Sequence, residues 1–185
     1  MVPRQITTVC LGFFCTLSLA WSGQGRYMDE ASFFDAALSS SQPEQGVLWI
    51  TPELRERIEA VVGHRYPRLR ARYWRSDDTT AWILDEIGKE EPITIGVSIR
   101  ARRVAMVRVL EFRESRGWEV RYPFFTDQFH GAALARGNDI DREIDGITGA
   151  TLSVAAVSRA VRLALLLDAQ VSASGDEVTA VARRD

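Results

Sequence analysis

The stretch Ile93-Thr94-Ile95-Gly96-Val97 alternates large apolar side chains with small or polar ones at a period of two. This period is typical of a β-strand with one buried face. The same alternation recurs in residues 68–73, 82–85 and 106–110. Because the connections beside these segments are short, they predict a mostly antiparallel meander.

Helical patterns flank the predicted sheet. An N-cap threonine, a proline at the first helical position and an early acidic residue predict a helix over residues 52–63. A second helix is expected to begin at Thr151, where a broad apolar stripe starts, and to end near Asp168. Strands and helices together predict one α+β domain over residues 50–168, a mostly antiparallel sheet with packed helices.

The segments around this domain give weaker patterns. Residues 23–49 are expected to be poorly ordered apart from a short helix near residues 28–38. Residues 131–137 predict a short helix or a turn, and residues 169–185 predict a flexible polar tail.

The N-terminus has the pattern of a secretory signal peptide over residues 1–22. Arg4 precedes an apolar run over residues 6–20, which is short for a membrane span. Small residues then predict cleavage after Ser22, and retention of the segment as an anchor is the alternative. The expected location is the periplasm or the outer face of the cytoplasmic membrane.

Composition narrows the chemistry that such an exported protein can perform. Cys10 and Cys15 are both removed with the signal peptide, which leaves no thiol for a disulfide, a haem attachment or an iron–sulfur cluster. His64 and His130 are too few to indicate a metal centre. The balance of 23 basic against 25 acidic residues gives no electrostatic support for a nucleic-acid partner, so none is predicted.

Five arginines interleaved with aromatic residues lie in residues 65–75. Two interpretations remain open. Alternation places Leu69, Ala71 and Tyr73 on one face and the arginines on the other, which is typical of a strand with one solvated face. The same arginines could instead dock an acidic redox partner or bind nucleic acid.

The segment most informative about function is Asp145-Gly146-Ile147-Thr148-Gly149-Ala150-Thr151-Leu152-Ser153, directly before the second predicted helix. It resembles the flavinylation motif of the FMN-binding domain family, which occurs in extracytoplasmic subunits of sodium-translocating NADH:quinone oxidoreductase and Rnf-type complexes. The resemblance extends over residues 50–167 and points to a small stand-alone branch of the family.

The resemblance implies that a flavin transferase joins FMN covalently, through its phosphate, to Thr151. It assigns the motif's acidic position to Asp145. The remaining cofactor-binding residues that it implies in this segment are Thr148, Gly149, Ala150, Leu152 and Ser153. Unpaired N–H groups and the positive end of the helix dipole would favour a phosphate at Thr151. The alternative is an ordinary N-cap threonine that needs no ligand.

A second match is Glu114-Ser115-Arg116-Gly117, which resembles the family's Glu-Thr-Pro-Gly turn near the flavin. Arg116 replaces the proline. Glu114, Ser115 and Gly117 are therefore candidate cofactor-binding residues, and Trp118 is the candidate for stacking on the flavin ring. A β-turn with a solvated glutamate is the alternative for the loop, and core packing is expected for most neighbouring aromatic residues.

These features predict an exported electron-transfer flavoprotein that carries covalent FMN. It requires an FMN transferase for modification and exchanges electrons with a membrane or periplasmic redox partner. Two alternatives remain: an exported FMN-dependent reductase of a small substrate, and a binding domain without redox chemistry.

Overall fold

The computed structural model describes residues 24–38, 43–135 and 137–182, with side chains described through residue 174. The predicted signal peptide, including its cleavage position after Ser22, lies outside the described residues.

The core of the fold is a six-stranded sheet in the order β1-β6-β5-β4-β3-β2, in which every neighbouring pair is antiparallel. The strands are β1 (Gly25–Arg26), β2 (Glu44–Trp49), β3 (Arg70–Ser76), β4 (Thr79–Ile87), β5 (Pro92–Arg100) and β6 (Arg103–Phe112). The predicted meander is therefore confirmed as β3 to β6. The edge strands β1 and β2 lie in the segment that we expected to be poorly ordered.

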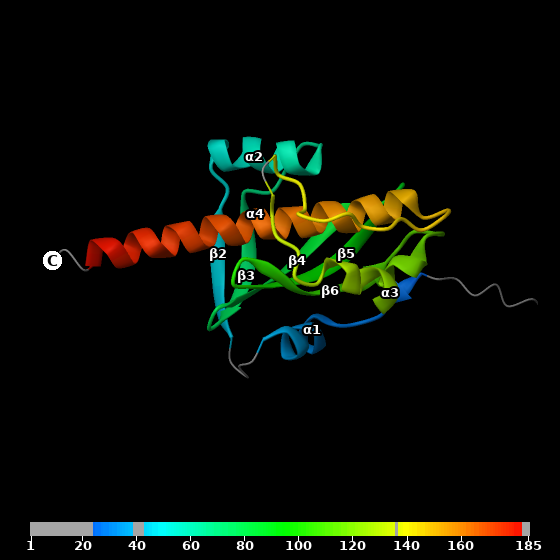
Figure 1. Ribbon diagram of the computed structural model, residues 1–185, viewed down its shortest axis with the longest axis horizontal. Helices are drawn as coiled ribbons and strands as arrows, with labels where there is room; N and C mark the ends of the chain where they lie inside the picture. The colour runs from blue at the N-terminus through cyan, green and yellow to red at the C-terminus, as the bar shows by residue number, and fades with distance from the viewer. Residues whose placement is uncertain (1–23, 39–42, 136, 183–185) are drawn as a thin grey trace, which may run out of the picture.

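The helices form layers on both faces of this sheet. They are α1 (Glu30–Ala37), α2 (Pro52–Val62), α3 (Pro123–Thr126) and α4 (Thr151–Ala182), with short 3-10 turns η1 (Trp118–Arg121) and η2 (Asp127–Phe129). Figure 1 shows α4 and α2 over one face and α1 over the other. This arrangement confirms the predicted α+β class, with the sheet between two helical layers.

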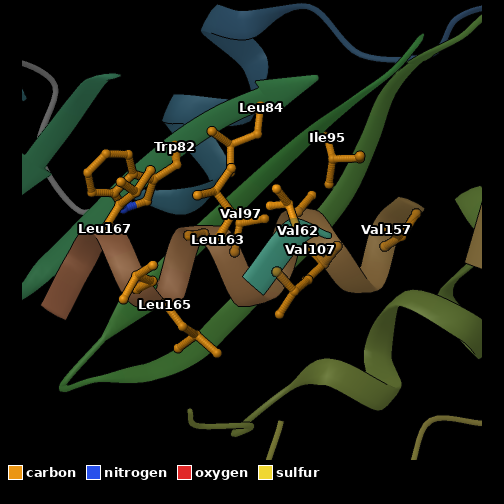
Figure 2. Packing of buried hydrophobic residues seen from close by; sticks show 14 of the residues in the cluster. Val62, Trp82, Leu84, Ile95, Val97, Val107, Val157, Leu163, Leu165 and Leu167 are labelled. Atoms are coloured by element: carbon orange, nitrogen blue, oxygen red, sulfur yellow. The ribbon is translucent and has the colours of Figure 1, made fainter. Parts of the chain in front are cut away.

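The larger core lies between the sheet and α4. Figure 2 shows Trp82 and Leu84 of β4 and Val97 of β5 directed toward the side of α4 that carries Leu163 and Leu167. All five side chains are buried. The broad apolar stripe of α4 therefore covers the inner face of the central strands, and this burial is the main stabilising contribution of the helix.

Among the described residues, α1 covers the opposite face only in part. Phe33 of that helix is fully buried and lies on Gly96 of β5, where a Cβ atom would come within 2.7 Å of the phenyl ring. Phe34 packs on Trp74 of β3 with ring centroids 4.2 Å apart. The glycine in the alternating stretch of β5 thus makes room for the helix that crosses it.

Two expectations from the sequence, the end of α4 and the face of Leu69, were wrong, and a third held only in part. Helix α4 does not end near Asp168 but continues to Ala182, because Asp168 is buried against Thr80 of β4 instead of ending the helix. Of the helix or turn expected over residues 131–137, the structure has turn positions at Gly131 and Gly137 and no helix where the segment is described, and Leu134 pairs with Ile140 as an isolated bridge. Leu69 does not share the buried face of Ala71, because β3 begins only at Arg70.

No helix in the part of the chain that the structure describes is both long and apolar enough to cross a membrane, α4 included.

Candidate functional site

The start of α4 is set by a turn that ends in Gly149. Gly149 has φ +83°, a left-handed conformation that a side chain would disfavour. The N–H of Ala150 donates to the Ile147 carbonyl at 3.0 Å, and the Ala150 carbonyl accepts from Val154 N–H at 2.9 Å. Ala150 therefore occupies the cap position, and Thr151 is the first helical residue.

The alternative interpretation of Thr151 as an ordinary N-cap residue is therefore wrong. Its side chain is exposed, and its hydroxyl makes no hydrogen bond to any residue that the structure describes. The N–H groups of Thr151, Leu152 and Ser153 lie in the first helical turn, where no intrahelical acceptor exists. The helix start therefore combines an exposed hydroxyl with unpaired backbone donors.

The two matched segments meet at one hollow of about 550 Å³ beside this helix start. Of the predicted site residues, those that line it are Glu114, Ser115, Gly149, Ala150, Thr151, Leu152 and Ser153. Gly117, Trp118, Asp145 and Thr148 do not line it. The predicted loop and the predicted motif are thus adjacent in space although 27 residues, from Trp118 to Ile144, separate them in the chain.

Glu114 has a defined structural role at the hollow. It is only 6% exposed, and its Oε1 accepts the backbone N–H groups of Lys89, Glu90 (2.6 Å) and Glu91 (3.0 Å). Burial alone raises the pKa of Glu114, but these N–H groups and the Lys89 ammonium hold the pKa below its usual value. The glutamate is therefore not a solvated turn residue. It orders the β4–β5 turn beside Thr151.

Two cations at the hollow were missed by the sequence analysis. Lys89 comes from the β4–β5 turn and Arg116 from the loop after β6. Lys89 Nζ lies 2.8 Å from the Glu90 carboxylate, and Arg116 has no carboxylate within salt-bridge distance in the described part of the chain. In the sequence, Arg116 stood out only because it replaces the proline of the family's turn. No local pattern in the sequence predicts that Lys89 lies near Thr151.

Trp118 lies outside the hollow, in an aromatic cluster around Arg121. The Arg121 guanidinium is 5.0 Å from the Trp118 ring centroid and 4.2 Å from that of Tyr27. Tyr122 meets Trp118 edge-on at 5.7 Å. Stacking of Trp118 on a flavin ring therefore stays a prediction. Core packing is confirmed for Phe125 and Phe129, which are fully buried, but it is wrong for Tyr122 and Phe124, which are exposed.

Asp145 and Thr148 lie on the exposed loop that leads into the hollow. The backbone N–H of Asp145 donates to the Gln128 side chain at 2.7 Å, which ties this loop to η2. The Asp145 carboxylate accepts no hydrogen bond from the described residues. It is therefore accessible from solvent a few residues before the exposed Thr151 hydroxyl.

Residues 88–166 match the family model of the FMN-binding domain. The chain carries an FMN-binding domain. The match confirms the family that the motifs indicated, and it contains every predicted site residue together with Lys89 and Arg116. It begins at the β4–β5 turn that Glu114 orders and ends within α4, so β1 to β4 and α2 lie outside it. No curated protein and no solved structure matches the chain significantly.

Proposed function

We propose that this FMN-binding domain carries its FMN covalently, as a phosphoester on Thr151 Oγ1, and that the protein is an exported electron carrier. The observation that carries the proposal is the exposed, unbonded Thr151 hydroxyl at the start of a long helix, inside a domain of this family.

The residues at the hollow suit the phosphate of FMN. The first-turn N–H groups of α4 and the positive end of its dipole favour an anion next to Thr151. Lys89 and Arg116 also line the hollow and add two side-chain cations. A volume of about 550 Å³ lies in the range of small-molecule and cofactor sites.

Attachment requires an activated flavin nucleotide and the transferase. In this step Thr151 Oγ1 would form the new bond to phosphorus, the bond between phosphorus and the leaving group of the nucleotide would break with its electrons going to the leaving group, and the hydroxyl proton would pass to a base of the transferase or to water. The product weighs the protein plus FMN minus one water. We assign Asp145 to orienting the acceptor loop on the transferase, because its exposed carboxylate lies outside the hollow.

FMN, when bound, supplies a ring system that accepts and returns one or two electrons. The protein residues at the hollow hold the phosphate end and leave the site open to solvent, since Thr151 and Leu152 are both exposed. An open site favours electron exchange with another protein over conversion of an enclosed substrate. Export rests on the signal-peptide pattern of residues 1–22.

The decisive experiment is to co-express the chain with an FMN transferase and to map the modified peptide by mass spectrometry. We expect the added mass on the peptide that contains Thr151, and yellow colour that survives denaturation. Thr151→Ala should abolish both. Ser158→Ala is the matched control, because Ser158 is a partly exposed hydroxyl residue of the same helix that lies outside the motif and does not line the hollow. An unmodified Thr151 peptide from a fully yellow preparation would overturn the assignment.

The electron-carrier role has a separate test. The flavinylated protein should exchange electrons with a protein redox partner and show no steady-state turnover with small acceptors alone. Sustained turnover of a small acceptor without any partner would instead identify a reductase.

A further inference from the structure

A groove of about 900 Å³ lies on the sheet face that α1 covers only in part. Its floor comes from β3 and β4, and α1 contributes Glu30 at one side. The residues that matter for the argument are Trp49, Arg68, Leu69, Arg70, Arg72 and Arg113. None of them lines the hollow at Thr151.

The strand register places the cations and the apolar side chains of the groove side by side. Trp49 of β2 pairs with Arg70 of β3, and Val47 pairs with Arg72. Directly paired residues of antiparallel strands point to the same face. Arg70 and Arg72 are two residues apart, so they lie about 7 Å apart along the strand on that face.

The charges of the groove are only partly compensated. Arg68 pairs with Asp85 at 2.8 Å, and Arg113 pairs with Glu111 at 2.7 Å. Arg70 and Arg72 have no carboxylate within salt-bridge distance among the described residues. The groove therefore carries excess positive charge on a chain whose formal net charge is −2.

Large apolar side chains lie exposed beside these cations. Trp49 is 65% exposed and Leu69 is 69% exposed, and both line the groove. A merely solvated strand face would carry a polar residue at the position of Trp49 in β2. Exposed aromatic and arginine side chains in a concave site are the residue types enriched at protein interfaces.

We propose that this groove binds an extended acidic segment of a partner protein. In an extended chain, side chains two residues apart share a face at about 7 Å spacing, which matches Arg70 and Arg72. Carboxylates at two such positions would pair with the two arginines, and a neighbouring apolar side chain would cover Trp49. A protein segment is favoured over a membrane because the surface is concave, whereas lipid binding requires apolar side chains that lie in the interface plane.

The groove and the hollow at Thr151 are lined by consecutive residues of the chain at one point. Arg113 lines the groove, and the next residue, Glu114, lines the hollow at Thr151. The two sites therefore adjoin in the chain, although the groove lies on the sheet face of α1 and the hollow lies at the start of α4, which covers the other face. The binding itself does not depend on the proposed function, since no groove residue takes part in flavin attachment.

The test uses a fluorescein-labelled peptide, Ser-Glu-Ser-Glu-Ser-Leu-Ser, and a Gln version of it, with binding measured by fluorescence anisotropy. We expect the Glu peptide to bind in a salt-sensitive manner and the Gln peptide to bind at least about tenfold more weakly. Protein with and without flavin should bind equally, so failure of flavin attachment does not affect the result.

Substitutions of groove residues test whether the Glu peptide binds in the groove. Arg70→Glu with Arg72→Glu should reduce affinity for the Glu peptide by about tenfold or more, and Trp49→Ala should also weaken it. Arg65→Glu is the matched control, because Arg65 is exposed on the preceding loop but does not line the groove. Arg70→Gln with Arg72→Gln repeats the test without charge reversal, and circular dichroism checks that every variant is folded.

Three outcomes would overturn the proposal. The first is no binding of the Glu peptide, and the second is equal weakening by the Arg65 control. The third is Trp49-dependent binding to vesicles of anionic phosphatidylglycerol without binding of the peptide, which would assign the surface to a membrane instead.

Discussion

Gly117 and Ser153 are in direct contact, and this contact joins the loop after β6 to the first turn of α4. A Cβ atom on Gly117 would lie less than 3.0 Å from the Ser153 hydroxyl oxygen and 3.3 Å from the Ala150 methyl group. Gly117 also has φ +84°. The glycine of the Glu-Ser-Arg-Gly loop is therefore required by packing against the motif helix, although it does not line the hollow.

Gly117→Ala is expected to destabilise the protein by about 1–3 kcal/mol, because the added methyl group meets α4 and the backbone conformation is left-handed. Denaturant unfolding measures this change. Gly146→Ala is the control, since a Cβ there would meet nothing within 4 Å. The flavin yield of Gly117→Ala should also fall, because the loop is displaced from Thr151. A variant as stable as the Gly146 control would show that the helix start can adapt.

Glu114→Gln should loosen the β4–β5 turn, because the substitution removes the charge that accepts three backbone N–H groups. We expect a loss of about 1–3 kcal/mol. Faster hydrogen exchange at Lys89, Glu90 and Glu91 is the specific readout, and Glu56→Gln on the exposed side of α2 is the control. Unchanged exchange at these three amides would contradict the role given to Glu114.

A partly exposed ion cluster around the buried Glu86 carboxylate predicts pH-dependent stability. His64 Nδ1 lies 3.0 Å from the Arg65 carbonyl and Nε2 lies 3.0 Å from the carboxylate of buried Glu86, which Arg159 also contacts at 3.0 Å. The hydrogen bond to the Arg65 carbonyl is the largest effect on the pKa of His64 and raises it. Partial burial and the Arg159 charge lower this pKa, whereas Glu86 raises it. The net result is a pKa above the usual 6.5. In the protonated ring both nitrogens donate, Nδ1 to the Arg65 carbonyl and Nε2 to the Glu86 carboxylate.

Because the folded-state pKa is raised, the stability that His64 contributes is complete below pH 6.5 and is lost as the pH rises through the raised value. Urea midpoints measured across this range should fall for the wild type. His64→Gln should flatten the profile, whereas His130→Gln should not, because the exposed His130 ring makes no hydrogen bond to the described residues. Identical profiles for wild type and His64→Gln would exclude this cluster as the cause.

Flavin attachment should depend on Asp145 more than on Ser153. Asp145→Asn keeps the shape of the side chain but removes the exposed charge assigned to orienting the loop, so the yield should collapse. Ser153→Ala should retain most of it, because Ser153 is buried against Gly117 and not presented to solvent. Fluorescence on a denaturing gel measures both. Equal flavin content in Asp145→Asn and wild type would remove Asp145 from the proposed attachment mechanism.

Short-range patterns in the sequence were sufficient to predict much of this protein. The period-two alternation of β5 and the Thr51 cap of α2 depend only on neighbouring residues, and the structure contains both elements. The same is true of the segment around Thr151, whose resemblance to the FMN-binding domain family is confirmed by the match over residues 88–166. Such features are encoded locally, where backbone preferences and side-chain order act within a few residues.

Long-range contacts decided what local patterns could not. Thr80 donates a hydrogen bond to Asp168, which is buried within α4 and does not end the helix as predicted. Glu114 accepts the backbone N–H of Lys89, 25 residues earlier in the chain. Lys89 and Thr151 line one hollow only because the antiparallel sheet brings the β4–β5 turn to the same end as the start of α4. Residues this far apart meet through burial and strand pairing, whose free energy depends on the folded arrangement as a whole and not on any local segment.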